Sequence, residues 1–221
     1  MSRLTLYNYF RSSAAYRVRI VLALKSLDYQ QVAIHLLRNG GEQHAPGYLA
    51  INPQGLVPSL QHDDAVLTQS MAICEYLDEV WPDPALLPRA PLQRAYVRSL
   101  MAAVACEIHP LNNLRVLDYL TGTLHIAEPD KLTWYRHWVA EGFGAVQRMI
   151  ESHGYAGRYC CGDEPGLADA FLIPQIFNAR RFEVDLQPFP RLVAIDQACA
   201  ELAAFQAAHP DRQPDRPKEG S

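Results

Sequence analysis

A proline-rich segment divides this sequence of 221 residues into two parts with different patterns. Residues 81–91 (WPDPALLPRAP) hold four prolines in eleven positions, and proline can neither continue a helix nor donate to a sheet. Short alternating apolar runs precede this segment, whereas longer runs at helical spacing follow it. We therefore place a domain boundary near residues 82–88, between a first domain of residues 1–82 and a second of residues 88–221.

The first domain alternates between strands and helices, in the order β-α-β, a long connection, and then β-β-α. Strands are expected at residues 4–10, 31–36, 57–61 and 65–68. One helix begins at Ala14, after the first strand, and another at Ser70, after the last. The connection at residues 38–53 is rich in Gly, Asn, Gln and Pro, which makes it a candidate ligand-binding loop.

The second domain is expected to be a helical bundle, because no strand pattern of comparable quality follows the prolines. Its helices are expected at residues 92–120, 130–152, 167–181 and 191–208. The polar, proline-rich tail at residues 209–221 is expected to lie on the surface as a flexible end.

Composition excludes several classes of function. Twenty Lys and Arg against 24 Asp and Glu give a net charge of -4, so no basic field attracts nucleic acid or an anionic membrane. No apolar run is long enough to span a bilayer, and the N-terminus lacks the pattern of a signal peptide. Five cysteines without CxxC spacing indicate reduced thiols in a cytoplasmic protein, with neither disulfides nor a metal site.

The first candidate for chemistry lies at residues 11–13, where the first strand gives way to a helix. Free N–H groups at a helix start favour a negative charge, and a serine hydroxyl can donate to a thiolate. Lowering a thiol pKa from ~8.5 by two units needs ~2.7 kcal/mol, part of which these groups can supply. The alternative is that Ser12 and Ser13 only cap the helix.

Two further candidates follow the long connection. Pro58 stands at the start of an expected internal strand, where it indicates an edge, a turn or a cis bond. With a cis bond, Val57 would turn its N–H and C=O toward a peptide-like ligand; the alternative is a plain edge-strand proline. Gln69 and Ser70 begin the next helix, where they could hold a carboxylate or merely cap.

Together these features make the chain similar to the zeta class of glutathione transferases, which includes maleylacetoacetate isomerases and bacterial maleylpyruvate isomerases. The resemblance implies a thioredoxin-like N-terminal domain, an all-helical C-terminal bundle, a homodimer and glutathione as cofactor. It covers nearly the whole chain and rests on residues 10–25 (FRSSAAYRVRIVLALK), 52–60 (NPQGLVPSL), 67–77 (LTQSMAICEYL), 109–117 (HPLNNLRVL), 162–175 (GDEPGLADAFLIPQ), 178–186 (NARRFEVDL) and 209–215 (HPDRQPD).

The resemblance also implies roles for individual residues. Ser12 is expected to activate the glutathione sulfur, with Arg11 beside it in the catalytic site. Arg11, Arg115 and Arg181 are expected to bind substrate carboxylates, since a planar guanidinium pairs with a carboxylate through two bonds. For Arg17, the alternative is packing and ion pairing. The residues expected to bind glutathione are Ser12, Ser13, Arg17, Gln43, Val57, Pro58, Gln69, Ser70, His109, Asn113, Leu114 and Arg115.

The implied activity is cis–trans isomerisation of maleylacetoacetate or maleylpyruvate, intermediates in the breakdown of tyrosine and gentisate. A thiolate adds to the conjugated carbon, the resulting single bond rotates, and elimination gives the trans product. Two alternatives stay open. One is a general transferase or dehalogenase acting on α-halo acids with the same thiolate. The other is a transferase-like interaction module without catalysis.

Three positions depart from the family pattern. Ala14 replaces the usual cysteine, so a mechanism that needs this thiol is in doubt. His109 stands where many members have Gln, which favours the maleylpyruvate branch. Gly166 replaces the Ser or Thr that precedes Asp169, a change that bears on folding. Other transferase classes use an early tyrosine to activate the thiol, but we expect Tyr7 to lie in the core.

Overall fold

The computed structural model describes residues 3–217, and these fall into two compact units. Unit 1 comprises Met1–Ala85 together with Leu202–Ser221, and unit 2 comprises Leu86–Glu201. Each unit is described by itself. The part of the expected flexible tail at residues 218–221 lies outside the described residues.

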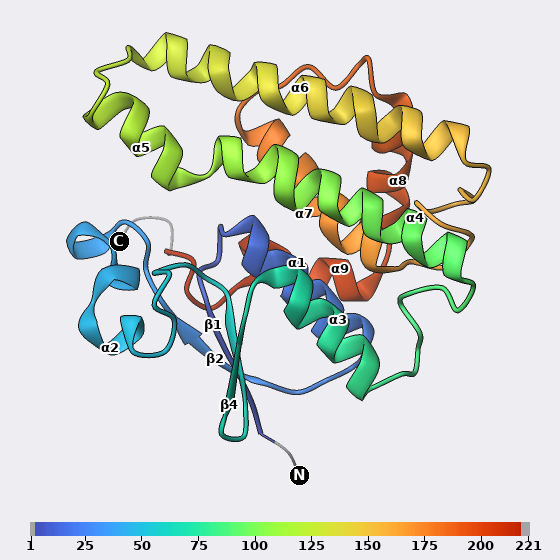
Figure 1. Cartoon of the computed structure of the whole chain (residues 1–221), viewed down its shortest axis with the longest axis horizontal. Coiled ribbons are helices and arrows are strands. Elements are labelled where there is room, and N and C mark those ends of the chain that lie inside the picture. Colours follow the sequence, from blue (N-terminus) through green and yellow to red (C-terminus); the bar gives the residue numbers. More distant parts are fainter. Residues whose placement is uncertain (1–2, 218–221) are drawn as a thin grey trace. The chain divides into compact units, whose positions relative to one another are not determined.

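Unit 1 is built around a mixed four-stranded sheet with the strand order β2-β1-β3-β4 (Figure 1). β1 pairs in parallel with β2 and antiparallel with β3, so that Leu6 lies opposite both Gln31 and Leu60. Leu6 and Leu60 are fully buried, which explains the apolar alternation along these strands. The strands are β1 (Leu4–Asn8), β2 (Gln30–Ala33), β3 (Ser59–His62) and β4 (Ala65–Thr68).

Two longer helices of unit 1, α1 and α3, pack against each other, and each has buried apolar residues, such as Ile20 in α1 and Leu77 in α3. A buried ammonium joins their C-terminal ends, because Lys25 Nζ contacts Asp78 Oδ1 at 2.7 Å and the Trp81 carbonyl at 2.6 Å. The long connection contains three short helical turns. The helical segments are α1 (Ser13–Leu24), η1 (Arg38–Gly40), η2 (Glu42–His44), α2 (Pro46–Leu49) and α3 (Ser70–Val80).

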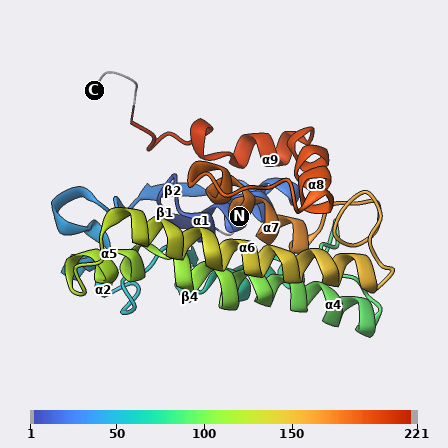
Figure 2. The ribbon, with the colours of Figure 1, turned by 90° about the horizontal axis from the view of Figure 1, so that it is seen from above.

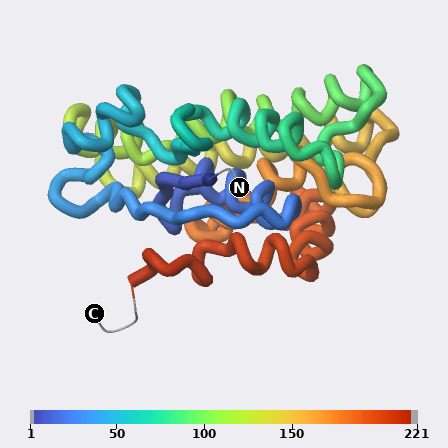
Figure 3. Tube along the Cα trace, turned by 90° about the horizontal axis from the view of Figure 1, so that it is seen from below, coloured from blue at the N-terminus to red at the C-terminus, as the bar shows by residue number. Residues whose placement is uncertain are grey.

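The C-terminal segment belongs to unit 1, which differs from the expected second domain of residues 88–221. α9 (Ala203–Ala208) packs along α1, and the short turn η5 (Pro210–Arg212) follows it (Figure 3). A fully buried guanidinium accounts for this docking, since Arg19 Nε donates to the Ala208 carbonyl at 3.0 Å. Within the described part of the tail, Gln213 is also buried. Five of the nine residues 209–217 are exposed, as expected for a surface tail, whereas the flexibility of the tail stays a prediction.

Unit 2 is entirely helical apart from its connections, and α5 and α6 lie side by side in it (Figure 2). The helix expected at residues 92–120 is interrupted, because Pro110 lies inside a short turn that separates α4 and its π-helical end from α5. The helix expected at residues 191–208 is likewise two helices, α8 and α9. The helical segments of unit 2 are α4 (Pro91–Ala102), η3 (Ala103–Ile108), η4 (His109–Asn112), α5 (Leu114–Gly122), α6 (Glu128–Ser152), α7 (Leu167–Arg181) and α8 (Pro190–Ala200).

α7 is the central helix of unit 2, and residues such as Phe171 and Ile176 are buried along it. Its start is fixed by the buried carboxylate of Asp169, which accepts from the Gly166 N–H and the Cys160 N–H at 2.9 Å each. Burial raises the pKa of Asp169, and these backbone bonds oppose that rise. Because Gly166 has no side chain, only half of a capping box forms here.

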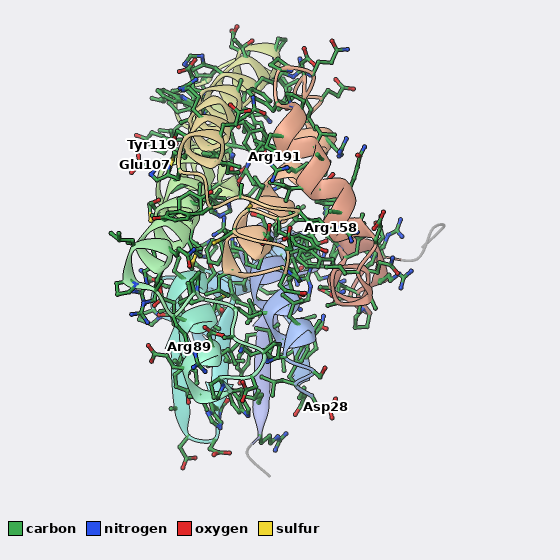
Figure 4. All side chains as sticks on the ribbon, turned by 90° about the vertical axis from the view of Figure 1, so that its right-hand side faces the viewer. Asp28, Arg89, Glu107, Tyr119, Arg158 and Arg191 are labelled. Carbon is green, nitrogen blue, oxygen red and sulfur yellow. The ribbon has the colours of Figure 1, made fainter. Side chains whose placement is uncertain are left out.

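Two arginine side chains hold the loop before α7, those of Arg158 and Arg191, and both are labelled in Figure 4. Arg191 donates to the carbonyls of Gly157 and Tyr159, and Arg158 pairs with Glu201. These contacts fix a loop that lacks regular structure.

Across residues 3–217, no helix combines the length and the apolar character needed to cross a bilayer.

All five cysteines are free thiols, and Cys74, Cys160 and Cys199 are buried. Burial raises the pKa of the Cys160 thiol well above its ordinary value. The protonated thiol is a poor nucleophile, so this cysteine contributes to packing.

Candidate active site

Ser12 is the N-cap of α1, at the point where the strand-to-helix pattern predicts a helix start. Its Oγ accepts from the Ala15 N–H at 3.2 Å, and its carbonyl accepts from the Tyr16 N–H at 2.9 Å. A hydroxyl that accepts through its oxygen still has its own hydrogen to donate. Capping and thiol activation by Ser12 are therefore compatible, because the first uses the oxygen and the second uses the hydrogen. Ser12 is half-buried, whereas Ser13 is buried.

Arg11 is oriented by two aromatic residues. Its Nη2 donates to the Tyr9 hydroxyl at 3.1 Å, and its guanidinium carbon lies 5.0 Å from the centroid of the Phe10 ring. The Tyr7 hydroxyl instead donates to Gln61 Oε1 at 3.1 Å, and its ring is half-buried. The hydroxyls of the two early tyrosines thus serve Arg11 and the sheet, which leaves Ser12 as the candidate thiol activator.

The peptide bond between Val57 and Pro58 is cis, as one of the sequence alternatives requires. Within residues 3–217, the N–H and C=O of Val57 take part in no hydrogen bond. The preceding carbonyl, that of Leu56, accepts from the Tyr48 hydroxyl at 2.6 Å and from Asn52 Nδ2 at 2.7 Å. This bracing leaves the backbone of Val57 available to pair with an extended peptide.

Gln43 lies in η2 and is only 8% exposed. Its Nε2 makes a long bond of 3.5 Å to the Leu36 carbonyl, and its Oε1 has no partner among the residues that the structure describes. A buried acceptor without a partner costs about 1–3 kcal/mol, which an N–H group of a ligand recovers. Gln43 and Val57 therefore fit a peptide-like cofactor such as glutathione.

Gln69 and Ser70 begin α3, and Gln69 has a left-handed backbone with φ of 68°. Such a backbone costs about 1–3 kcal/mol for a residue with a side chain, and it is typical of binding sites. The Gln69 side chain is exposed and donates to Gln54 Oε1 at 2.8 Å. Ser70 Oγ accepts from Arg17 Nη1 at 3.1 Å. Arg17 is 1% exposed, so it lies behind Ser70 and joins α1 to the start of α3.

In unit 2, the interruption between η3 and α5 brings together the residues expected there. His109 Nε2 lies 3.2 Å from Asn113 Nδ2, and Asn113 caps α5 by accepting from the Arg115 N–H at 3.2 Å. Leu114 is half-buried, and Arg115 is exposed. The broken helix thus places a histidine and an arginine at the same helix start.

Arg181 ends α7 with its guanidinium carbon 5.0 Å from the centroid of the Phe182 ring. Phe182 stacks on the Tyr135 ring, with centroids 3.9 Å apart. Burial raises the pKa of Tyr135, and the positive charge of Arg181 opposes that rise. The neighbouring Arg180 forms an ion pair with Asp196 at 2.7 Å.

Sequence reasoning missed the residues that support the site. Tyr9 orients Arg11, and Tyr48 and Asn52 brace the loop before Val57. The one available signal was Asn52 in the segment NPQG, a polar residue that proves to be 1% exposed. The partners of these side chains lie only two to eight residues away in the sequence, but the residue types alone do not show which group each side chain will meet.

The chain is similar in sequence and in structure to known proteins. The family model "Glutathione S-transferase, N-terminal domain" matches residues 2–79. The maleylacetoacetate isomerase of Pseudomonas aeruginosa is 49% identical, over 96% of this chain and 98% of its own. A solved holo structure of a bacterial maleylpyruvate isomerase of the zeta class is 45% identical, with a TM-score of 0.93 over 96% of this chain and 100% of that chain.

A further solved structure carries ligands. The maleylacetoacetate isomerase of Anaeromyxobacter dehalogenans, solved with bound dicarboxyethyl glutathione and citrate, is 43% identical. Its TM-score is 0.87, over 98% of this chain and 99% of that chain. These matches confirm the expected fold class, a thioredoxin-like unit combined with an all-helical part.

The mixed sheet, the cis proline and the helix start at Ser12 define a protein with the glutathione transferase fold. More narrowly, the chain belongs to the zeta class of glutathione transferases, the family of the maleylacetoacetate and maleylpyruvate isomerases.

Proposed function

We propose that this protein catalyses the glutathione-dependent cis–trans isomerisation of maleylacetoacetate or maleylpyruvate. The observation that carries the proposal is Ser12, whose oxygen is held by the Ala15 N–H while its hydrogen stays available to a sulfur. Ser12 also lies at the positive end of α1 and directly follows Arg11 in the sequence. The relatives named above support the proposal, since they match this chain over nearly its whole length.

When bound, glutathione would supply a thiolate that can add to the conjugated carbon of the substrate, and after rotation about the resulting single bond the same thiolate would be eliminated to restore the double bond in the trans form. Ser12 donates its hydroxyl hydrogen to the sulfur and, together with the helix start, favours the thiolate. Val57 pairs with the cysteinyl backbone next to cis Pro58, and Gln43 accepts from a glutathione N–H. Gln69 and Ser70 hold the γ-glutamyl carboxylate.

The remaining glutathione ligands complete the proposed site. Ser13 and Arg17 are the proposed glutathione ligands from α1. Arg17 is buried behind the Ser70 hydroxyl, so it supports glutathione binding through its hydrogen bond to Ser70. The proposed ligands from unit 2 are His109, Asn113, Leu114 and Arg115. Position 14 is alanine, so no step in this mechanism uses a thiol of the protein at that position.

The substrate carboxylates are assigned to Arg11, Arg115 and Arg181, because guanidinium groups bind carboxylates through paired hydrogen bonds. An anionic substrate agrees with the relative that was solved with dicarboxyethyl glutathione and citrate. Arg11 follows the strand end that leads into Ser12, so it can bind a carboxylate of the substrate while the sulfur reacts. His109 is assigned to the ketone oxygen, where a donor stabilises the charge that develops after addition.

The decisive experiment follows the ultraviolet absorbance of maleylacetone, a cis analogue, with and without glutathione. Wild-type protein is expected to isomerise it only when glutathione is present. Ser12→Ala removes the donor to the sulfur and is expected to lower kcat about 10²-fold, the scale for losing one donor to a developing anion. Ser152→Ala, in the last turn of α6, is the matched control and is expected to keep wild-type activity.

Absence of isomerisation in a protein that still binds glutathione would contradict the proposal. In that case, halide release from an α-halo acid tests the transferase or dehalogenase alternative with the same variants. If maleylacetone is isomerised, maleylpyruvate and maleylacetoacetate are compared as substrates, because His109 favours the first and the relatives include enzymes named for each.

We further propose a cytoplasmic homodimer. The buried free thiols Cys74, Cys160 and Cys199 favour a reducing compartment. Val66 on the edge strand β4 and Val80 at the end of α3 are each 43% exposed, which provides apolar surface on unit 1 for a second copy. Light scattering measures the mass in solution, and cell fractionation tests the location.

A further inference from the structure

The strand end that leads into Ser12 is bound by a residue from the opposite end of the chain. The Phe10 N–H donates to Asp215 Oδ2 at 2.8 Å, across 205 residues of sequence. The other oxygen of the same carboxylate, Oδ1, accepts from Gln31 Nε2 at 3.1 Å. Phe10 and Asp215 both belong to unit 1, in which α9 packs along α1 (Figure 3). Phe10 precedes Ser12 by two residues, so this bond acts on the backbone that carries the catalytic hydroxyl.

The buried guanidinium of Arg19 binds the same strand end by donating to a backbone carbonyl and to a side-chain oxygen of that end. Arg19 is 1% exposed and donates to the Phe10 carbonyl at 3.0 Å and to Asn8 Oδ1 at 2.6 Å. Its Nε donates to the Ala208 carbonyl at 3.0 Å, which ties α9 to this cluster. Burial lowers the pKa of Arg19 to about 10, and the charge of Asp215 opposes that change, so the guanidinium remains protonated at neutral pH.

The tail that carries Asp215 is itself ordered by hydrogen bonds. Gln213 is 7% exposed, and its Nε2 donates to the carbonyls of Ala207 and His209 at 3.0 Å each. The His209 ring packs edge-on against Tyr16 of α1, with centroids 6.1 Å apart. Asp215 therefore reaches Phe10 from a fixed backbone.

The hydrogen bond from the Phe10 N–H to Asp215 is important because Phe10 lies in the turn between β1 and α1. The Ser12 N–H donates to the Tyr9 carbonyl at 2.9 Å, which closes a tight turn with Phe10 and Arg11 at its two central positions. The Phe10 N–H points out of that turn, and Asp215 is the partner that receives it. The peptide plane of Phe10 sets the direction of the chain through Arg11 to Ser12, so its restraint passes directly to both proposed catalytic residues.

We propose that Asp215 is a positioning residue for Ser12, so that the C-terminal tail fixes the turn from which the serine hydroxyl meets the glutathione sulfur. This inference rests on the proposed function, because it assumes that Ser12 activates the thiol. It also explains the motif HPDRQPD at residues 209–215, to which the proposed mechanism gives no part. An error of about 1 Å in the placement of a catalytic group can cost 10²-fold in rate, so a remote restraint of this kind is measurable.

The test measures the pKa of the bound glutathione thiol, from the ultraviolet absorbance of the thiolate during a pH titration. Asp215→Ala removes the acceptor of the Phe10 N–H. This variant is expected to raise the bound thiol pKa toward the free value of ~8.5 and to lower kcat about tenfold, with little change in KM for glutathione. Asp215→Asn keeps one acceptor oxygen and is expected to retain most of the wild-type thiol pKa.

Two further variants complete the design. Asp211→Ala is the matched control, because Asp211 lies on the same tail and pairs with Arg216 and His209 instead of contacting the turn. Gln31→Ala keeps the Asp215 carboxylate but removes its second donor. It is expected to shift the thiol pKa in the same direction by a smaller amount, and it carries the test if Asp215→Ala does not fold.

The outcomes separate this inference from the proposed function. A wild-type thiol pKa in both Asp215→Ala and Gln31→Ala would overturn the positioning role and leave the isomerase proposal intact. Equal effects of Asp215→Ala and Asp215→Asn would also overturn it, since the charge and not the acceptor would then matter. A wild-type protein that lowers the thiol pKa without isomerising maleylacetone would refute only the isomerase. A free-solution thiol pKa in wild-type protein would refute both.

Discussion

At the scale of single residues, the candidate site depends on Ser12 and Arg11 and on the hydrogen-bond partners that orient them. Ser12 uses its oxygen for the helix and keeps its hydrogen for a ligand, whereas Arg11 uses one nitrogen to reach Tyr9 and keeps the others for a carboxylate. Each residue was identifiable from the sequence alone. The partner of Arg11 was not, because a tyrosine inside a strand pattern indicates a core position.

Tyr9→Phe tests whether the Tyr9 hydroxyl positions Arg11 for a substrate carboxylate. The variant removes one hydrogen bond worth about 0.5–1.5 kcal/mol, so kcat/KM for maleylacetone is expected to fall about two- to tenfold. The pKa of the bound glutathione thiol should stay unchanged, because Ser12 is untouched. Tyr7→Phe is the matched control, since the Tyr7 hydroxyl contacts Gln61 instead. A kcat/KM equal to that of wild type would show that Arg11 needs no such support.

His209 gives the tail a pH dependence whose direction follows from the structure. Burial lowers the pKa of His209 below its ordinary value of 6.5, and the charges of Arg19, Arg212 and Arg216 act in the same direction, whereas Asp211 opposes them. The unfolded chain therefore takes up a proton first as the pH falls through about 6.5. The free energy of unfolding is highest above this pH and decreases on acidification, until the pH passes below the pKa of the folded state.

The prediction is checked by thermal unfolding of wild type and His209→Gln between neutral and mildly acidic pH. Wild type should lose more of its melting temperature on acidification than the variant does, because glutamine has no proton to take up. Parallel curves for the two proteins would mean that His209 titrates alike in the folded and unfolded states.

At the scale of elements, the start of α7 shows how a helix can require the less favoured capping residue. Gly166 stands where the family has Ser or Thr, and glycine is in general a tolerable N-cap residue. In the structure, a Cβ at this position would lie 2.8 Å from the Leu86 carbonyl oxygen, and that carbonyl already accepts from the Leu167 N–H at 3.0 Å. Glycine is therefore required by the close approach of another backbone segment within unit 2.

Gly166→Ala is expected to lower the free energy of unfolding by about 1–3 kcal/mol, the usual cost of inserting a carbon into a packed site. Gly122→Ala is the control, since a Cβ there has no atom within 4 Å and α5 ends at this residue. That variant should be neutral or slightly stabilising. The measurement is the midpoint of urea unfolding. A Gly166→Ala protein as stable as Gly122→Ala would show that the Leu86 segment moves aside without cost.

At the scale of the whole molecule, local patterns predicted a first domain of strands and helices, a second domain of helices, and the order of these elements along the chain. They did so because alternation and helical spacing persist along each segment. They failed at one local helix breaker and where the structure depends on distant partners. The helix expected at residues 92–120 continues past His109 in apolar pattern, yet Pro110 interrupts it. The tail at residues 209–215 is polar enough to suggest a free end, yet Asp215 and Gln213 find partners.

The candidate site was predicted in the same uneven way. Ser12, Val57 and Ser70 lie at element boundaries, which a sequence marks with serine, proline and turn residues. The contacts of Arg17 with Ser70 and of Arg19 with Ala208 could not be predicted, because they join segments that are 53 and 189 residues apart in the chain.

The return of residues 202–217 to unit 1 also has a consequence for the order in which a newly made chain acquires activity. Strands β1 to β4 emerge from the ribosome first, but Arg19 meets Ala208 and Phe10 meets Asp215 only when the final helix has been translated. At ~5–20 residues per second, that delay is on the order of ten seconds. A chain that still lacks residues 202–217 holds Ser12 in a turn without the contacts to Ala208 and Asp215, and we expect its thiol activation to be weaker until this segment has been made.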